Sequence, residues 1–226
     1  PLLTENYVKG DFRAAGKLVQ DNLTMLVAFL LPATIGAVAI AEPLYTVFYG
    51  KPDSLALGLF ILAMLQTVIL GLYTVLSPMI QALFQNRKAI LYFGYGVLVK
   101  LILQVPFIYL FKAYGPLLST TIGLMIPIVL MYKEIHLVTQ FNRKTVFKRS
   151  LLTAILTLIM LLVVLLSAFI LGFVIKPNGR VTSMIYVALI GGVGIIFYGG
   201  LGLRLRFLDR FIGSKAASLR DKFHIS

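Results

Sequence analysis

Long stretches of this chain carry no charged residue, and this pattern restricts the fold more than any other feature. The uncharged gaps are 20 to 33 residues long, and a helix needs about 20 apolar residues to cross a hydrocarbon core. Only 13% of the 226 residues are charged, roughly half of the proportion in a soluble domain. The sequence therefore predicts an all-α fold, a polytopic transmembrane helical bundle.

Six spans are expected between the charged connectors. They cover residues 23–41, 55–84, 89–111, 116–132, 151–175 and 182–203. Pro32 is expected to bend the first span. The second span is 30 residues long, about 45 Å of helix, so we expect it to tilt or to break at Ser77-Pro78.

The connectors divide the chain into five parts. Apolar residues recur at helical spacing among the charges of the N-terminal segment, which predicts an amphipathic helix over residues 1–21 that lies along the membrane interface. The expected parts are a cytoplasmic amphipathic connector helix (1–22), four spans (23–132), a basic cytoplasmic loop (133–149), two additional spans (150–203) and a basic amphipathic cytoplasmic tail (204–226).

Lysine and arginine are unequally divided between the two sides of the expected spans. One set of connectors holds 16 of the 21 basic residues, the other holds 4, and Lys100 lies within a span. Connectors rich in basic residues remain in the cytoplasm, so both termini are expected there. The net charge of +13 then indicates contact with anionic membrane lipids in the cytoplasmic leaflet and not with nucleic acid.

The composition excludes several kinds of chemistry. The chain has no cysteine and two histidines, so no disulfide, thiolate metal site or cysteine nucleophile is possible. No phosphate-binding loop, zinc-protease or serine-hydrolase motif is present. We therefore expect no metal, no cofactor and no enzymatic activity.

Lys100 is the one charge in the middle of an expected span, about 15 Å along the helix from Ile90. Burying it costs about 2.5–3.5 kcal/mol, whereas the span's apolar side chains return roughly 4–8 kcal/mol. The ammonium either lines a polar cavity for an anionic substrate, or it snorkels or binds a backbone carbonyl. Gln104, Gln66 and Tyr73 are further candidates for the cavity, although such residues also form hydrogen bonds between helices.

Two other features have both a structural and a functional interpretation. Glu42 falls at the outer end of the first span. It either marks the end of the helix at the membrane interface or supplies a carboxylate that couples transport to a proton or ion. Glycines of the sixth span either permit close helix packing or form a groove for a lipid tail; these are Gly191, Gly192, Gly194 and Gly199.

The first 50 residues carry a specific resemblance to a known family. The residues in question are Gly10-Asp11, Pro32, Glu42-Pro43 and Phe48-Tyr49-Gly50, and the later segment 111–123 adds a turn followed by Ser-Thr-Thr and a glycine. This pattern resembles the multidrug/oligosaccharidyl-lipid/polysaccharide exporter superfamily. Within it, the chain is similar to the lipid II flippase (MurJ-like, YtgP-like) and polysaccharide biosynthesis branch.

The resemblance implies an architecture and a function. Members have fourteen spans in two lobes plus an additional C-terminal pair, and this chain would supply the last six spans, so we expect it to be a fragment that lacks the N-terminal lobe. The implied function is translocation of a polyprenyl-pyrophosphate-linked cell-wall precursor across the bacterial cytoplasmic membrane by alternating access. The alternatives are a flippase for teichoic or capsular repeat units, a cation-coupled small-molecule exporter, or a non-transporting scaffold for cell-wall enzymes.

Overall fold

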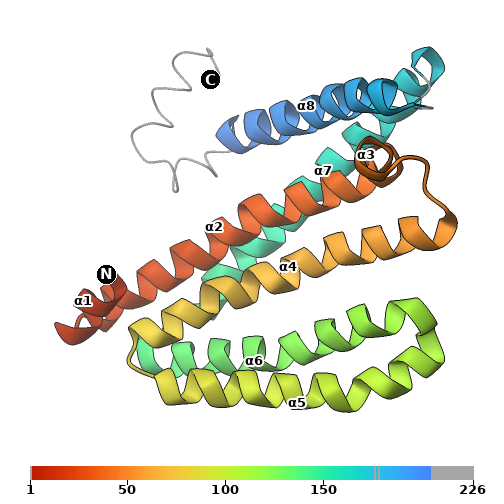
Figure 1. Ribbon diagram of the computed structural model, residues 1–226. Helices are drawn as coiled ribbons and strands as arrows, with labels where there is room; N and C mark the ends of the chain where they lie inside the picture. The colour runs from red at the N-terminus through yellow and green to blue at the C-terminus, as the bar shows by residue number, and fades with distance from the viewer. Residues whose placement is uncertain (1, 176, 178, 205–226) are drawn as a thin grey trace. The chain divides into compact units, whose positions relative to one another are not determined.

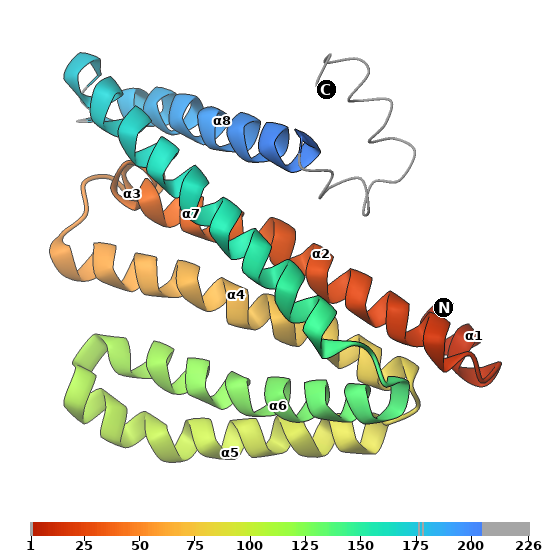
Figure 2. The same cartoon turned by 180° about the vertical axis from the view of Figure 1, so that it is seen from behind.

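The computed structural model describes residues 2–175, 177 and 179–204, and within these ranges the regular secondary structure is entirely helical. The expected all-α class is confirmed. The elements, drawn in Figures 1 and 2, are α1 (Leu2–Val8), α2 (Phe12–Ala39), α3 (Ala41–Tyr49), α4 (Ser54–Ala82), α5 (Asn86–Phe111), the 3-10 turn η1 (Lys112–Tyr114), α6 (Gly115–Thr139), α7 (Arg143–Val174) and α8 (Arg180–Arg204). The predicted basic tail lies outside the described residues from position 205 onward.

Five helical segments of the described chain are long and apolar enough to cross a membrane, against the six expected. The difference arises in the segment Asn86–Thr139, which is 54 residues long and counts once. It contains α5, η1 and α6, and Figure 1 shows that the chain reverses at η1 so that α6 returns beside α5. The 3-10 turn continues the helical geometry between two antiparallel helices. The chain is thus a multi-pass membrane protein.

The N-terminal residues do not form the single amphipathic helix expected over residues 1–21. The helix α1 ends at Val8, and Gly10 adopts a φ of 75°, a conformation that glycine accepts without steric cost. Asp11 Oδ1 then accepts a hydrogen bond from the backbone N–H of Ala14 at 2.9 Å and caps the start of α2. Because α2 continues from Phe12 to Ala39, much of the expected interfacial helix belongs to the helix of the first span.

The basic loop expected over residues 133–149 is also largely helical. The helix α6 extends to Thr139, and Gln140 ends it in the left-handed conformation with φ 49° and ψ 33°. The helix α7 begins at Arg143, only three residues after Gln140. In α4, the expected break at Ser77-Pro78 does not occur, since the helix continues through Pro78.

The chain forms two compact units, and each has its own packing. Unit 1 comprises Pro1–Leu30 and Ile61–Ser150. Its core lies where the first part of α2 and the last turns of α4 meet the start of α5, the end of α6 and the start of α7. The buried residues are Val19, Leu23, Leu76, Met79, Ile80, Leu83, Ala89, Met131, Ile135, Phe141 and Val146.

Unit 2 comprises Leu31–Phe60 and Leu151–Ser226. In its described part, α3 packs against α8. The hydroxyl of Tyr186 on α8 donates a hydrogen bond to the carbonyl of Ala168 on α7 at 2.8 Å. This bond satisfies a polar group that would otherwise be buried without a partner.

Candidate functional site

The helices α5 and α6 approach each other closely at Gly96 and Gly123. A Cβ atom added to Gly96 would lie 2.5 Å from the carbonyl oxygen of Gly123, and one added to Gly123 would lie 2.8 Å from the carbonyl oxygen of Gly96. Only glycine permits this separation, because any other residue places its Cβ inside the facing backbone. The two glycines therefore fix the point at which the helices cross.

A seam of buried residues runs along α6, and its first half meets α5. The residues recur every fourth position, so that neighbours in the seam lie one above the other on the helix; they are Gly115, Ser119, Gly123, Pro127, Met131, Ile135 and Thr139. Small residues occupy the first half of the seam. A Cβ added to Gly115 would lie 2.5 Å from the carbonyl oxygen of Phe107, so the hairpin is also tight near η1.

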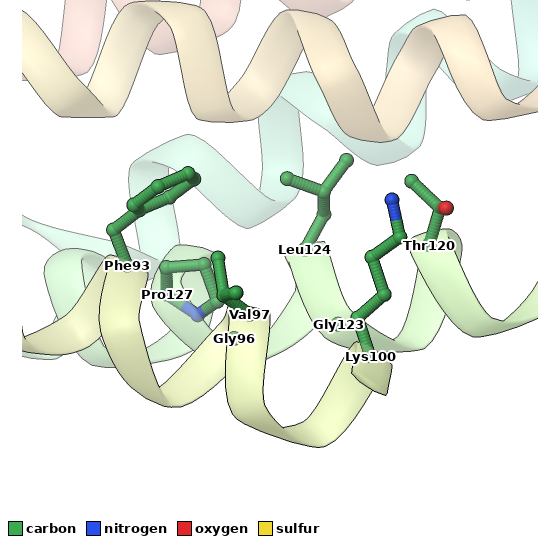
Figure 3. Close-up of a pocket in the computed structure, with 8 residues that line it drawn as sticks. All are labelled: Phe93, Gly96, Val97, Lys100, Thr120, Gly123, Leu124 and Pro127. Atoms are coloured by element: carbon green, nitrogen blue, oxygen red, sulfur yellow. The ribbon is translucent and has the colours of Figure 1, made fainter. Parts of the chain in front are cut away.

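A hollow of about 120 Å³ lies beside this crossing. Its lining consists of Phe93, Gly96, Val97 and Lys100 from α5 and Thr120, Gly123, Leu124 and Pro127 from α6. Figure 3 shows the side chains of Lys100 and Thr120 near each other, on the side of the helix pair to which Leu124 also points. The ammonium and this hydroxyl are the two polar side-chain groups of an otherwise apolar lining.

Lys100 is partly buried and has no carboxylate partner in the part of the chain that the structure describes. The three ion pairs found there join Lys9 to Glu5, Lys88 to Glu134 and Arg149 to Asp21. A midspan cation without a counter-ion is costly. The charge is therefore available to an anion that enters the hollow.

The other predicted cavity residues occupy different places. Tyr73 on α4 contacts Phe93 of the lining, with ring centroids 5.8 Å apart, but it is not itself part of the lining, and its cavity role stays a prediction. Gln104 lies one turn after Lys100 and is partly buried, and Gln66 is partly buried on α4. Neither glutamine is part of the lining, and a cavity role for both stays a prediction.

Thr120 was not predicted from the sequence. It belongs to Ser119, Thr120 and Thr121, three consecutive hydroxyl residues within an apolar span. That triplet is the signal that singles out this position on α6. The triplet alone does not show which of the three residues lines the hollow with Lys100, because this depends on the rotation of α6 about its axis relative to α5.

The glycines of α8 differ among themselves. A Cβ added to Gly194 would lie 3.1 Å from Val164 of α7, so this residue packs closely. In the described structure no atom lies within 4 Å of a Cβ added to Gly191, Gly192 or Gly199. These three glycines do not serve close packing there, and a lipid-groove role for all four stays a prediction.

Charged residues also occur outside the hollow. Glu42 lies exposed in the first turn of α3, and a coupling role stays a prediction. The Lys88 ammonium contacts Glu134 Oε1 at 2.6 Å, and the Tyr92 hydroxyl donates to Glu134 Oε2 at 3.2 Å. This contact ties the start of α5 to the last turns of α6, and the pattern of charges alone did not predict it.

The fold and the hollow together define a polytopic helical membrane protein with a cation held between two membrane helices. The chain is similar to "Lipid II flippase MurJ" of Bacillus subtilis (strain 168), with 29% identity over 220 residues. It is also similar to a solved structure titled "Lipid II flippase MurJ, inward closed conformation", with a TM-score of 0.65 and 20% identity. No family model matches the chain.

The extent of these similarities confirms the resemblance noted in the sequence. The match to the Bacillus protein includes 95% of this chain but 40% of the relative. The match to the solved structure includes 90% of this chain and 42% of the other. The chain thus spans about two fifths of the length of the proteins it matches, which fits a C-terminal portion of the larger fold.

Proposed function

We propose that this chain is part of a flippase that moves a polyprenyl-pyrophosphate-linked cell-wall precursor, similar to lipid II, across the bacterial cytoplasmic membrane. The observation that carries this proposal is the similarity to a lipid II flippase along 95% of the chain. The helical hairpin supports the proposal, because its Lys100 has no carboxylate partner among the described residues and the diphosphate of such a precursor is anionic. Transport would use alternating access, in which one group of helices moves as a body against another.

The charge of Lys100 supplies an attraction of useful size in this setting. A cation and an anion 4 Å apart attract each other by about 4 kcal/mol at an effective dielectric constant of 20. The lining around the ammonium is otherwise apolar apart from Thr120, and an apolar surrounding weakens such an attraction less than bulk water does. A hollow of about 120 Å³ has room for a phosphate group, and Lys100 would contact this anionic portion of the precursor.

Other partners follow from the arrangement of the remaining groups. Exposed basic residues cluster near the α6–α7 connection and would face anionic lipids of the cytoplasmic leaflet; they are Lys133, Arg143, Lys144 and Lys148. The open glycine positions on α8 would accommodate the polyprenyl tail. An N-terminal lobe would complete the transport pathway.

The alternatives have less support. A flippase for teichoic or capsular units, a small-molecule exporter and a scaffold all agree with a multi-pass fold. None of them is the activity named for the relative or for the solved structure. The relatives are transporters, which agrees with the expectation that the chain is not an enzyme.

Replacement of Lys100 in the whole protein tests the proposal. We expect Lys100→Met to reduce growth complementation of a strain that lacks its own lipid II flippase, and Lys100→Arg to retain much of the activity because it preserves the charge. Lys112→Met is the matched control, since Lys112 is exposed in η1 and its charge lies outside the hollow. Protein abundance in the membrane is measured in parallel. Wild-type growth with Lys100→Met at normal abundance would contradict the cavity role.

A further inference from the structure

The position of Thr120 relative to Lys100 follows from the crossing of the two helices. Lys100 lies four residues after Gly96, and Thr120 lies three residues before Gly123. Because α5 and α6 are antiparallel, both steps lead from the crossing toward η1. At a rise of 1.5 Å per residue they amount to about 6 Å and about 4.5 Å. The two residues therefore lie at nearly the same level of the hairpin, and Figure 3 shows their side chains near each other.

The stem of Lys100 is held against the facing helix. A Cβ added to Gly123 would lie 2.8 Å from the Cβ of Lys100, so the absence of a side chain at position 123 makes room for the base of the lysine. The lysine thus leaves the crossing in a confined direction. An ammonium with restricted freedom loses less conformational entropy when it binds an anion.

The hydroxyl of Thr120 is able to change its hydrogen-bond partner. It donates to the carbonyl oxygen of Pro116 at 2.7 Å, and the hydroxyl of Ser119 donates to the same oxygen at 3.0 Å. If the Thr120 proton turns toward a ligand, Ser119 still satisfies the carbonyl. This change requires only rotation about the C–O bond of the hydroxyl.

From these contacts we infer that Lys100 and Thr120 form a two-point subsite for a phosphate oxygen of a lipid. Lys100 provides the charge, and Thr120 donates a hydrogen bond to the same phosphate group. The inference rests on the proposed function for its preferred ligand, a polyprenyl diphosphate, but the same chemistry would also bind the phosphate of an anionic phospholipid. The hollow far exceeds the ~15 Å³ that one water needs, so it accommodates a phosphate group.

Thr121 provides a matched control for Thr120. Its hydroxyl donates to the carbonyl of Leu117 at 2.9 Å, the same type of bond within the helix, but Thr121 is not part of the lining. Thr120→Val and Thr121→Val therefore remove the same hydroxyl from adjacent positions of one helix. Only the first removes it from the hollow.

The experiment measures binding of radiolabelled polyprenyl diphosphate to the whole protein in nanodiscs of neutral lipid. We expect Thr120→Val to weaken binding about tenfold, the effect of losing a hydrogen bond to a charged group. Thr120→Ser should restore binding, and Thr121→Val should stay within about twofold of the wild type. Adding Thr120→Val to Lys100→Met should weaken binding by much less than tenfold, because the two residues share one ligand.

A second arm replaces the labelled probe with phosphatidylglycerol and distinguishes the two sources of phosphate. If the same variants weaken phosphatidylglycerol binding but leave polyprenyl diphosphate unaffected, the subsite stands and the proposed function loses its support. If the whole protein binds polyprenyl diphosphate tightly and Thr120→Val has no effect with either probe, the subsite is wrong and the proposed function stands. Equal losses of binding affinity in Thr120→Val and Thr121→Val also overturn the subsite. In that case the loss of affinity in Lys100→Met reports the contribution of the lysine charge without Thr120.

Discussion

Replacing Gly96 with alanine adds one methyl group where α5 crosses α6 at Gly123. The new Cβ would lie 2.5 Å from the carbonyl oxygen of Gly123 and 2.8 Å from Cδ of Pro127. Ordinary contact begins at 3.4 Å, so the helices must separate by roughly 1 Å before the methyl group fits. A backbone oxygen and a proline ring have no alternative rotamer that would relieve the overlap.

Gly94 provides the control for this substitution. It lies on the same helix, and no atom of the described structure lies within 4 Å of a Cβ added there. Both substitutions bring the gain of about 0.5–1 kcal/mol that alanine has over glycine inside a helix. Only Gly96→Ala carries the cost of overpacking, about 1–3 kcal/mol. The difference between the two variants therefore isolates the packing cost.

The measurement is the melting temperature of the whole protein in a mild detergent, followed by the fraction that stays monodisperse after heating. Gly94→Ala should melt at or above the wild-type temperature, and Gly96→Ala should melt below it. A difference of 1–3 kcal/mol corresponds to roughly 2–12 °C for a chain of 226 residues, and to a smaller shift in the longer whole protein. Equal melting temperatures for the two variants would refute the close crossing of α5 and α6.

Two further predictions concern orientation and the contact at the other end of the hairpin. In intact cells, a cysteine placed at Asp53 should react with an impermeant thiol reagent, and one placed at Asn142 should not. The reason is that the connectors on the side of Asn142 hold 16 basic residues and those on the other side hold 4. Labelling at Asn142 would show that the predicted orientation is wrong. Glu134→Gln should lower the melting temperature, because it removes the charge of a carboxylate that is only 13% exposed and lies 2.6 Å from the Lys88 ammonium. The decrease should be smaller in a protein that already carries Lys88→Met. An unchanged melting temperature in the Glu134 variant would mean that the ion pair does not stabilise the hairpin.

The sequence predicted the spans well because charge marks the edge of the hydrocarbon core. The second span was expected over residues 55–84, and α4 covers Ser54–Ala82. The ends of helices were predicted less well, since a helix does not stop where the membrane stops. The charged residues that suggested a loop over 133–149 instead extend α6 to Thr139 and begin α7 at Arg143.

The candidate site was predictable only in part. Lys100 stands out in any reading of the sequence, because a midspan charge is costly wherever it faces. The role of Thr120 depends on which sides of α5 and α6 meet, and α6 is too uniformly apolar for its sequence to show that. Gln66 was selected for its polarity and Gln104 because it lies one turn after Lys100 on the same face of the helix, and the structure leaves both outside the lining.

The glycines show most directly why position matters more than number. The last span holds six glycines, which suggested close packing there. Of the four singled out, only Gly194 has a neighbour near an added Cβ among the residues that the structure describes. Gly94 and Gly96 lie two residues apart on α5, yet only Gly96 faces a close neighbour in the described structure, and it meets Gly123 where α5 and α6 cross. A glycine permits contact but does not create it, because a second helix must present its own small residue at the same level. That pairing depends on how two helices align, and here the same alignment brings Lys100 and Thr120 into one hollow.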